Sequence, residues 1–351
     1  MPVAGRRPII LGLVGDSAAG KTTLTRGLVN ILGRERVTHV CTDDYHKYDR
    51  EERAKLQITP LDPDCNYIDV MELHLERLHY GQAMLKPVYD HRNGSLVRPE
   101  YVQPRDFVIV EGLLGFSTPV LEQFYDVKVY LDPPEPLRRL WKVKRDTAKR
   151  GYTEQQVLAE LERREKDSER FIRPQRERAD IVVQFHPTEG AATDDDAGPQ
   201  LDVRLVLRPT IPHPDLSYLL EKDANDGAEI RLALGRDGGR PVDFLDIDGN
   251  VTSEHAAQLE AAIWQHLPDL PPVREDQFGD YQDRAEIRHS HPLALTQLLL
   301  TYHLLRKHAD PAHLPFAAPV AALSRLDSSR AKPAAPSSSE AEREVAEQRR
   351  T

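Results

Sequence analysis

The sequence predicts an α/β fold in which a mostly parallel sheet is flanked by helices and followed by a smaller α+β extension. Two observations carry this prediction. The first part of the chain alternates strand-like and helix-like segments, which is the pattern of a parallel sheet. The strand-like segments have apolar residues at both odd and even positions, as expected for strands covered by helices on both faces. With 351 residues, the chain is long enough for a large buried core.

The first part of the chain is predicted to contain five buried strands. They lie at Ile9–Val14, Val37–Thr42, Phe107–Glu111, Val127–Leu131 and Ile181–Phe185. Helical patterns are found at Lys21–Leu32, Tyr67–Tyr80, Glu135–Arg150 and Thr153–Ile172. The last of these helices is rich in arginine, which is typical either of a solvated helix or of a lid over phosphates. The Asn93-Gly94 pair between apolar residues predicts a β-hairpin within 86–103.

The chain is predicted to divide into four parts. These are a core at 1–186, an acidic linker at 187–200, an α+β extension at 201–310 and a disordered tail at 311–351. In the extension, strands are expected at Leu201–Leu207, Ile230–Leu234 and Val242–Ile247, and helices at Ser253–His266 and Leu293–His308. The pattern leaves open whether the extension is a separate domain or continues the first sheet.

Composition and charge disfavour several classes of protein. The formal net charge of −10 argues against a nucleic-acid partner, because phosphate contacts need a basic surface. No uninterrupted apolar run approaches the roughly 20 residues that span a bilayer, so no membrane partner is expected. The two cysteines, Cys41 and Cys65, are too few for a disulfide framework or a structural zinc site. A cytoplasmic location is therefore expected.

A phosphate-binding loop lies between the first predicted strand and the first predicted helix. Eight residues match the pattern G-x4-G-K-[ST]: Gly15, Asp16, Ser17, Ala18, Ala19, Gly20, Lys21 and Thr22. Thr23 follows this loop and is also a candidate for nucleotide binding. The glycines let backbone N–H groups converge on a phosphate. Lys21 adds a cation at the β- and γ-phosphates, and the Thr22 hydroxyl can bind Mg²⁺. The motif in this context predicts a P-loop NTPase-type sheet that binds ATP or GTP.

Carboxylates follow two other predicted strands, at the positions where open α/β sheets bind their ligands. Asp43 and Asp44 follow the second strand, and Glu111 ends the third, where it can bind Mg²⁺ through water. A kinase that acts on an alcohol needs a carboxylate to accept the hydroxyl proton. Adjacent residues leaving a strand point to opposite sides, so Asp43 and Asp44 cannot both serve in this way.

Basic residues are available for the transferring phosphoryl group and for a phosphate on the acceptor. The candidates for the first role are Lys144, Arg145 and Arg150, and those for the second are Arg50, Arg53 and Lys55. For Arg53 and Lys55, an ordinary solvated helix is an equally good interpretation. His91, beside the hairpin turn, becomes a candidate only if the hairpin folds over the strand ends.

Several ordered motifs together resemble the phosphoribulokinase family, in particular its plant and cyanobacterial branch within the phosphoribulokinase/uridine kinase superfamily. They are GLVGDSAAGKTT, CTDDYHKYDR, ITPLDPDCNYID, KPVYDHRNG, VIVEGLLG and WKVKRDTAKRGYT. The resemblance runs from about residue 9 to Phe185 and continues more weakly through the C-terminal region. It implies a kinase of the Calvin cycle that uses ATP and Mg²⁺ to convert D-ribulose 5-phosphate to ribulose 1,5-bisphosphate. A homo-oligomer, as a dimer, is expected.

The resemblance also implies roles for individual residues. In the family's pattern Asp43 is the catalytic base, Lys21 and Thr22 are the phosphate-loop pair, and Glu111 is the metal-associated carboxylate. Substrate-binding positions match His46, Arg50 and His91, and Arg145, Asp146 and Arg150 match a catalytic and sugar-phosphate cluster. The substrate lysine is not cleanly placed, because Arg53 and Lys55 straddle its position. Ala19 occupies the position of a redox cysteine, so Cys41 lacks the partner that thiol switching needs.

Three alternatives remain open on these motifs. A uridine or cytidine kinase shares the phosphate loop and the motif around Asp43. His46 in place of that family's usual tyrosine, the surrounding arginines and the length of the chain all favour a sugar phosphate. A kinase for another sugar phosphate fits the same residues. A non-catalytic nucleotide-binding regulator fits less well, because every matched catalytic position is filled.

Overall fold

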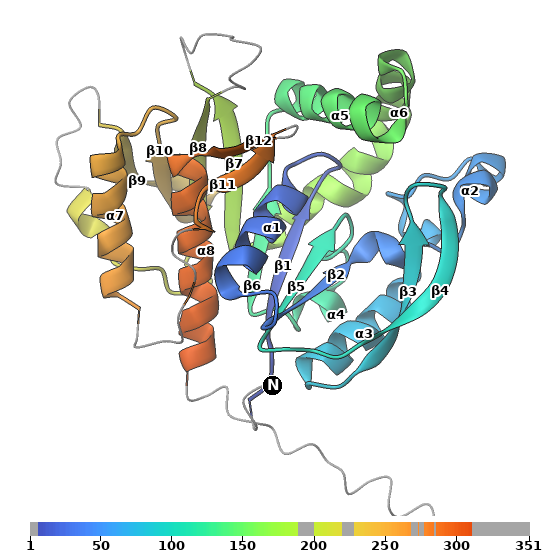
Figure 1. The fold of residues 1–351 in the computed structure, drawn as a ribbon, viewed down its shortest axis with the longest axis horizontal. Coiled ribbons are helices and arrows are strands. Elements are labelled where there is room, and N and C mark those ends of the chain that lie inside the picture. Colours follow the sequence, from blue (N-terminus) through green and yellow to red (C-terminus); the bar gives the residue numbers. More distant parts are fainter. Residues whose placement is uncertain are drawn as a thin grey trace, which may run out of the picture. The chain divides into compact units, whose positions relative to one another are not determined.

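An eight-stranded sheet forms the centre of the computed structural model, in the order β2-β5-β1-β6-β7-β8-β10-β9 (Figure 1). The strands β2 (Val37–Cys41), β5 (Phe107–Gly112), β1 (Ile9–Gly15), β6 (Val127–Leu131) and β7 (Ile181–Pro187) are parallel. The strands β8 (Leu201–Leu207), β10 (Arg240–Ile247) and β9 (Ile230–Asp237) continue the sheet antiparallel. The structure describes residues 6–188, 200–219, 228–267, 273, 277–283 and 286–310. Most of the predicted linker (189–199) and the predicted tail (311–351) lie outside them.

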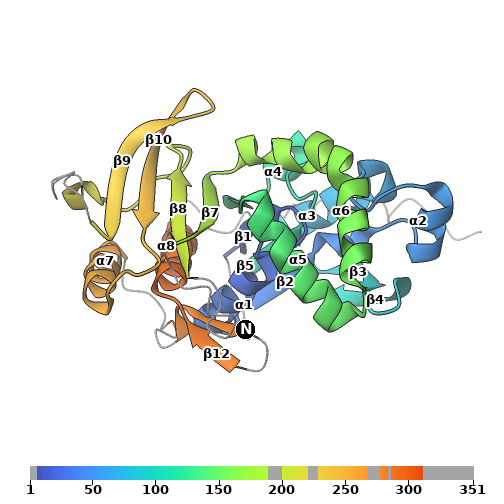
Figure 2. The same cartoon turned by 90° about the horizontal axis from the view of Figure 1, so that it is seen from above.

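Helices cover both faces of this sheet, as Figure 2 shows. On one face lie α1 (Lys21–Leu32), α7 (Ser253–Gln265) and α8 (His291–Ala309), and on the other α3 (Ile68–His79) and α4 (Pro119–Glu122). In β1, Ile9, Leu11 and Leu13 pack into the apolar core that includes α1, α7 and α8. Ile10 and Val14 pack into the core on the opposite face of the sheet, which includes α3 and α4. This division explains why β1 carries apolar residues on both of its faces.

Three further helices and two ribbons lie outside these layers. They are α2 (Arg50–Leu56), α5 (Glu135–Arg150), α6 (Glu154–Asp167), the ribbon of β3 (Met84–Asp90) with β4 (Ser95–Val102), and the ribbon of β11 (Asp280–Asp283) with β12 (Glu286–His289). The helices α5 and α6 lie at the end of the sheet where β1 leads into the phosphate loop (Figure 1). None of the described helices is long and apolar enough to cross a membrane.

The predicted fold class is confirmed, with one question now answered. Because β8 pairs with β7 along its length, the extension continues the first sheet and is not a separate domain. The predicted helix at Thr153–Ile172 is partly wrong, since the α-helix ends at Asp167 and continues as a π-helical turn, Ser168–Ile172. Pro174, which lacks the N–H group that would continue an α-helical hydrogen-bond ladder, follows that turn.

Candidate active site

A cavity of about 2240 Å³ lies at the carboxyl ends of the parallel strands. Its walls come from the phosphate loop, from the segment after β2, from α2 and the β3–β4 turn, and from α5 and α6. Residues of the extension, from β8 and from the ends of β12 and α8, complete the wall beside Trp141 and Phe185. The cavity therefore joins every motif that the sequence singled out.

The phosphate loop has the backbone shape that a phosphate cradle needs. Gly15, Ala18 and Gly20 all have positive φ angles, of 155°, 67° and 97°. At Gly15 a Cβ atom would also lie 2.6 Å from the backbone oxygen of Leu131, so no larger residue fits there. Lys21 Nζ donates to the backbone oxygens of Gly15 at 2.7 Å and Asp16 at 2.8 Å. Burial lowers the pKa of Lys21, although nearby carboxylates oppose this.

The side chain of Asp16 links the phosphate loop to neighbouring segments of the chain. Its carboxylate accepts hydrogen bonds from the backbone N–H of Ser17 at 2.7 Å and from the hydroxyl of Ser168, and Arg138 Nη1 lies 3.5 Å away. The neighbouring Asp167 accepts from Thr59 Oγ1 at 2.5 Å. The junction of α6 and the π-helical turn is therefore tied to the phosphate loop through Ser168 and to the segment after α2 through Asp167.

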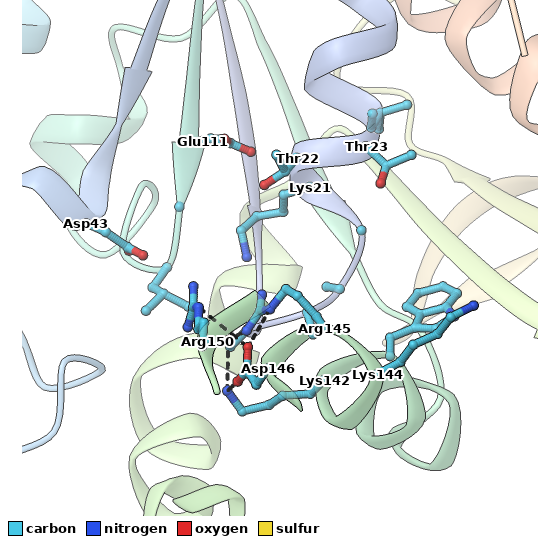
Figure 3. A pocket seen from close by; sticks show the side chains of 18 of the residues that line it. Lys21, Thr22, Thr23, Asp43, Glu111, Lys142, Lys144, Arg145, Asp146 and Arg150 are labelled. Carbon is cyan, nitrogen blue, oxygen red and sulfur yellow. Dashed lines mark hydrogen bonds and ion pairs between the residues drawn. The ribbon is translucent and has the colours of Figure 1, made fainter. Parts of the chain in front are cut away.

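Asp43 faces the cavity with a free carboxylate oxygen (Figure 3). Its Oδ1 atom is buried and has no hydrogen-bond partner among the described residues, and His91 Nε2 lies 3.8 Å from Oδ2. Burial alone would raise the pKa of Asp43, but the neighbouring histidines and Lys21 outweigh it and hold that pKa below its ordinary value. The carboxylate is therefore ionised and available to accept a proton.

Asp44 points away from Asp43 and is part of the framework. Its carboxylate accepts hydrogen bonds from Lys86 Nζ and from the backbone N–H of Tyr89, the latter at 2.9 Å. Both donors belong to β3, so Asp44 fastens the β3–β4 ribbon beside the end of β2. His91 is thereby carried over the strand ends, which is the condition that made it a candidate.

The predicted acceptor residues lie on one wall of the cavity, with one exception. His46 Nδ1 is 2.7 Å from Asn66 Oδ1. Arg50 Nη2 donates to the backbone oxygen of His91 at 2.8 Å, and Arg53 is buried and donates to Tyr89 Oη at 2.5 Å. Lys55 is exposed on α2 and does not line the cavity, so of the pair left open by the sequence only Arg53 does.

Basic groups of α5 gather around Asp146 opposite Asp43 (Figure 3). Arg145 Nε and Lys142 Nζ donate to this carboxylate at 2.7 and 3.1 Å, and Arg150 Nε lies 3.6 Å away. Burial opposes ionisation, but the hydrogen bond from Arg145 and the surrounding cations lower the pKa of Asp146 to about 2. Arg145 Nη2 also donates to Ser17 Oγ at 3.3 Å. Asp146 thus positions the cations beside the loop.

Two buried basic residues of this group were missed by the sequence interpretation. Arg138 donates to the backbone oxygen of Ser17 at 3.1 Å, and Lys142 lies 3.4 Å from the Ser17 hydroxyl. Burial, with the nearby Arg164, lowers the pKa of Lys142 to about 8. The signal was present, because Arg138, Lys142 and Asp146 recur every four residues and share one face of α5.

Side-chain oxygen atoms that could bind a metal ion lie beside the phosphate loop. Thr22 and Thr23 lie in the first turn of α1 with their side chains exposed to the cavity, and Glu111 is the residue before the last in β5 (Figure 3). Glu111 Oε2 accepts from Thr25 Oγ1 at 3.2 Å, and His39 Nε2 lies 3.0 Å from Oε1. A hydroxyl and a carboxylate are the donor types that Mg²⁺ prefers, so Thr22 and Glu111 fit this ion.

Comparisons with known proteins agree with this geometry. Residues 10–192 match the model of the "Phosphoribulokinase / Uridine kinase family". A phosphoribulokinase of Synechocystis sp. is 34% identical over 257 residues, which cover 69% of this chain and 77% of that protein. A uridine kinase of Chloroflexus aurantiacus is 32% identical over 181 residues, which cover 50% of this chain and 86% of that protein. The solved phosphoribulokinase from Rhodobacter spheroides has the same fold, with a TM-score of 0.53 at 20% identity over 74% of this chain and 96% of that structure.

Proposed function

The chain belongs to the phosphoribulokinase/uridine kinase family, and from this premise we propose that it is a phosphoribulokinase. It transfers the γ-phosphoryl group of ATP to the free primary hydroxyl of D-ribulose 5-phosphate, which gives ribulose 1,5-bisphosphate and ADP. The observation that carries the proposal is the ionised Asp43, which faces the cavity beside the Lys21 loop and opposite the α5 cations.

The residues divide the chemistry between them. Asp43 accepts the proton of the attacking hydroxyl on its carboxylate, which lines the cavity. The loop N–H groups and Lys21 bind the β- and γ-phosphates, and Arg145 offsets the charge that spreads over the transferring group. Thr22 and Glu111 would hold Mg²⁺, which neutralises the phosphate oxygens when it is bound. Asp146 accepts a hydrogen bond from Arg145 and so keeps this cation beside the phosphate loop.

The acceptor wall favours a phosphorylated sugar over a nucleoside. Arg50 and Arg53 lie on the wall that holds His46 and His91, and guanidinium groups suit a phosphate. The likeness to the Synechocystis phosphoribulokinase spans 257 residues, against 181 for the Chloroflexus uridine kinase, so it extends further beyond the part that both kinds of enzyme share. A uridine or cytidine kinase remains the second candidate, because that shared part holds the phosphate loop and Asp43.

Release of ADP, measured with ribulose 5-phosphate and with uridine as alternative acceptors, tests the substrate. We expect turnover with the sugar phosphate, and turnover with uridine alone would overturn the proposal. For the mechanism, Asp43→Asn should keep its affinity for ATP and lose at least about 100-fold in turnover, the low end for a general base. Asp69→Asn, on the exposed first turn of α3, is the matched control and should stay close to wild type.

The oligomeric state and the location are part of the same proposal. We propose a homodimer in the cytoplasm, because the family resemblance implies self-association and because the chain carries only two cysteines. Light scattering on the purified protein and fractionation of the source cells test the two statements separately.

A further inference from the structure

We propose that Cys41, Asp43 and His91 form a binding site for a borderline-soft divalent cation such as Zn²⁺, and that this ion inhibits the kinase by occupying its base. The inhibitory half of the proposal rests on the proposed role of Asp43. The binding half rests on the three side chains alone.

The three donors converge from separate segments of the chain. Cys41 ends β2, Asp43 lies in the following 3₁₀ turn (Thr42–Tyr45), and His91 lies in the turn between β3 and β4. A thiol sulfur, a carboxylate oxygen and an imidazole nitrogen lie within 4.8 Å of one another. Tetrahedral zinc with the usual bond lengths needs donor separations of about 3.3–3.6 Å. The distance from His91 Nε2 to Asp43 Oδ2 is already 3.8 Å, so small side-chain rotations close the site.

Neighbouring groups leave these donors available. Asp44 and Glu111, the carboxylates nearest in sequence and along the strand ends, are engaged by Lys86 and by His39 with Thr25. Asp43 Oδ1, in contrast, is buried and lacks a hydrogen-bond partner in the described part of the chain. Among the described residues, no other group of His, Cys, Asp and Glu side chains brings three potential ligand atoms this close together.

The mixed donor set selects against the ion that the kinase uses. Sulfur and nitrogen donors favour Zn²⁺ or Co²⁺, whereas Mg²⁺ favours oxygen donors such as those of Thr22 and Glu111. On binding, the Cys41 thiol releases its proton to solvent and the thiolate forms the metal–sulfur bond, with no change of oxidation state. Three protein ligands leave one position for water.

An ion at this site has two consequences for catalysis. The Asp43 carboxylate is occupied as a metal ligand and can no longer accept the hydroxyl proton. The ion also ties the β3–β4 turn to the end of β2, across the wall where the acceptor is proposed to bind. Inhibition should therefore be competitive with the sugar phosphate, and added Mg²⁺ should not relieve it.

Cobalt absorption tests the site without any kinase assay. Metal-free protein titrated with Co²⁺ should develop a thiolate-to-cobalt charge-transfer band and tetrahedral visible bands, which Zn²⁺ then displaces. Cys41→Ala should lose the charge-transfer band and at least about 10-fold in Co²⁺ affinity. Cys65→Ala removes the chain's other thiol, which lies outside the cavity, and should behave as wild type. If Cys41→Ala is not folded by circular dichroism, His91→Gln should lower Co²⁺ affinity by the same factor.

A kinase assay with free Zn²⁺ set by a metal buffer tests the inhibition. Zn²⁺ should inhibit wild type and Cys65→Ala alike, and the inhibitory concentration should rise at least about 10-fold in Cys41→Ala. Absence of the cobalt band in wild type, or its persistence in Cys41→Ala, would overturn the metal site even if ribulose 5-phosphate is turned over. A Cys41-dependent band in a protein that does not turn over this acceptor would refute the proposed function and leave the site standing.

Discussion

Replacing Ser168 with alanine removes the hydroxyl that donates a hydrogen bond to Asp16 in the phosphate loop. The Asp16 carboxylate, whose side chain is 10% exposed, then loses one of three partners and keeps the Ser17 N–H and Arg138. A hydrogen bond to a charged group contributes about 1.5–3 kcal/mol. We take the lower end, about 1.5 kcal/mol, because two partners remain.

This loss should appear mainly in nucleotide binding. A loop that is less well held must be ordered when the phosphates bind, and about 1.4 kcal/mol corresponds to a tenfold change in a dissociation constant. Ser168→Ala should therefore raise the Kd for ATP and for ADP about 10-fold, as measured by isothermal titration calorimetry. The Kd for the acceptor should change less, since Asp167 still accepts from Thr59.

Ser117→Ala is the matched control for this experiment. The Ser117 hydroxyl oxygen is also buried but has no hydrogen-bond partner among the described residues. Its removal should leave nucleotide affinity within about twofold of wild type, because no bond of the kind in question is lost. An unchanged Kd in Ser168→Ala, or an equal effect of Ser117→Ala, would show that Ser168 does not position the loop.

Two further predictions concern stability. Lys86→Met leaves the Asp44 carboxylate buried without its cation and should lower the free energy of unfolding by about 3–5 kcal/mol. The control Lys55→Met, at an exposed position, should stay within about 0.5 kcal/mol of wild type. Equal urea midpoints for the two variants would contradict the stabilising role of the Lys86–Asp44 pair. His213 Nδ1 lies 3.2 Å from His303 Nε2, and burial lowers the pKa of both histidines from 6.5. Below pH 6.5 the unfolded chain therefore binds protons that the folded chain does not, so stability should fall as the pH drops, and His303→Gln should weaken this dependence of the urea midpoint.

The parts of the site predicted from sequence are those that depend on local chain geometry. The run from Gly15 to Thr22 specifies its own backbone shape, so the phosphate loop could be recognised without the fold. Asp43 could be placed because the carboxyl ends of parallel strands meet at one edge of the sheet. Asp43 and Asp44 diverge as predicted, but the reason differs, because both lie in a 3₁₀ turn in which successive side chains point about 120° apart. The partner of Asp44 could not be predicted.

The parts that were missed depend on contacts between distant segments. Ser168 and Asp16 are 152 residues apart, and no pattern near either one indicates the other. Lys86 and Asp44 likewise meet only because the β3–β4 ribbon folds beside β2. Helix α2 is too short to show periodicity, and its signal was the capping box between Asp49 and Glu52. Whether the extension continued the sheet depended on the pairing of β7 with β8, which sequence alone leaves open.

Helix α8 of the extension forms part of the core on which the phosphate-loop half of the chain is built. It is buried around most of its circumference, and it packs against α1, the helix that begins at Lys21. Gly27 of α1 lies so close that a Cβ atom there would be 2.0 Å from Gln297 Nε2. The extension thus supplies part of the core beneath the phosphate loop. A gene fragment ending at the predicted linker would encode all the catalytic residues and yet lack the α8 surface against which α1 packs.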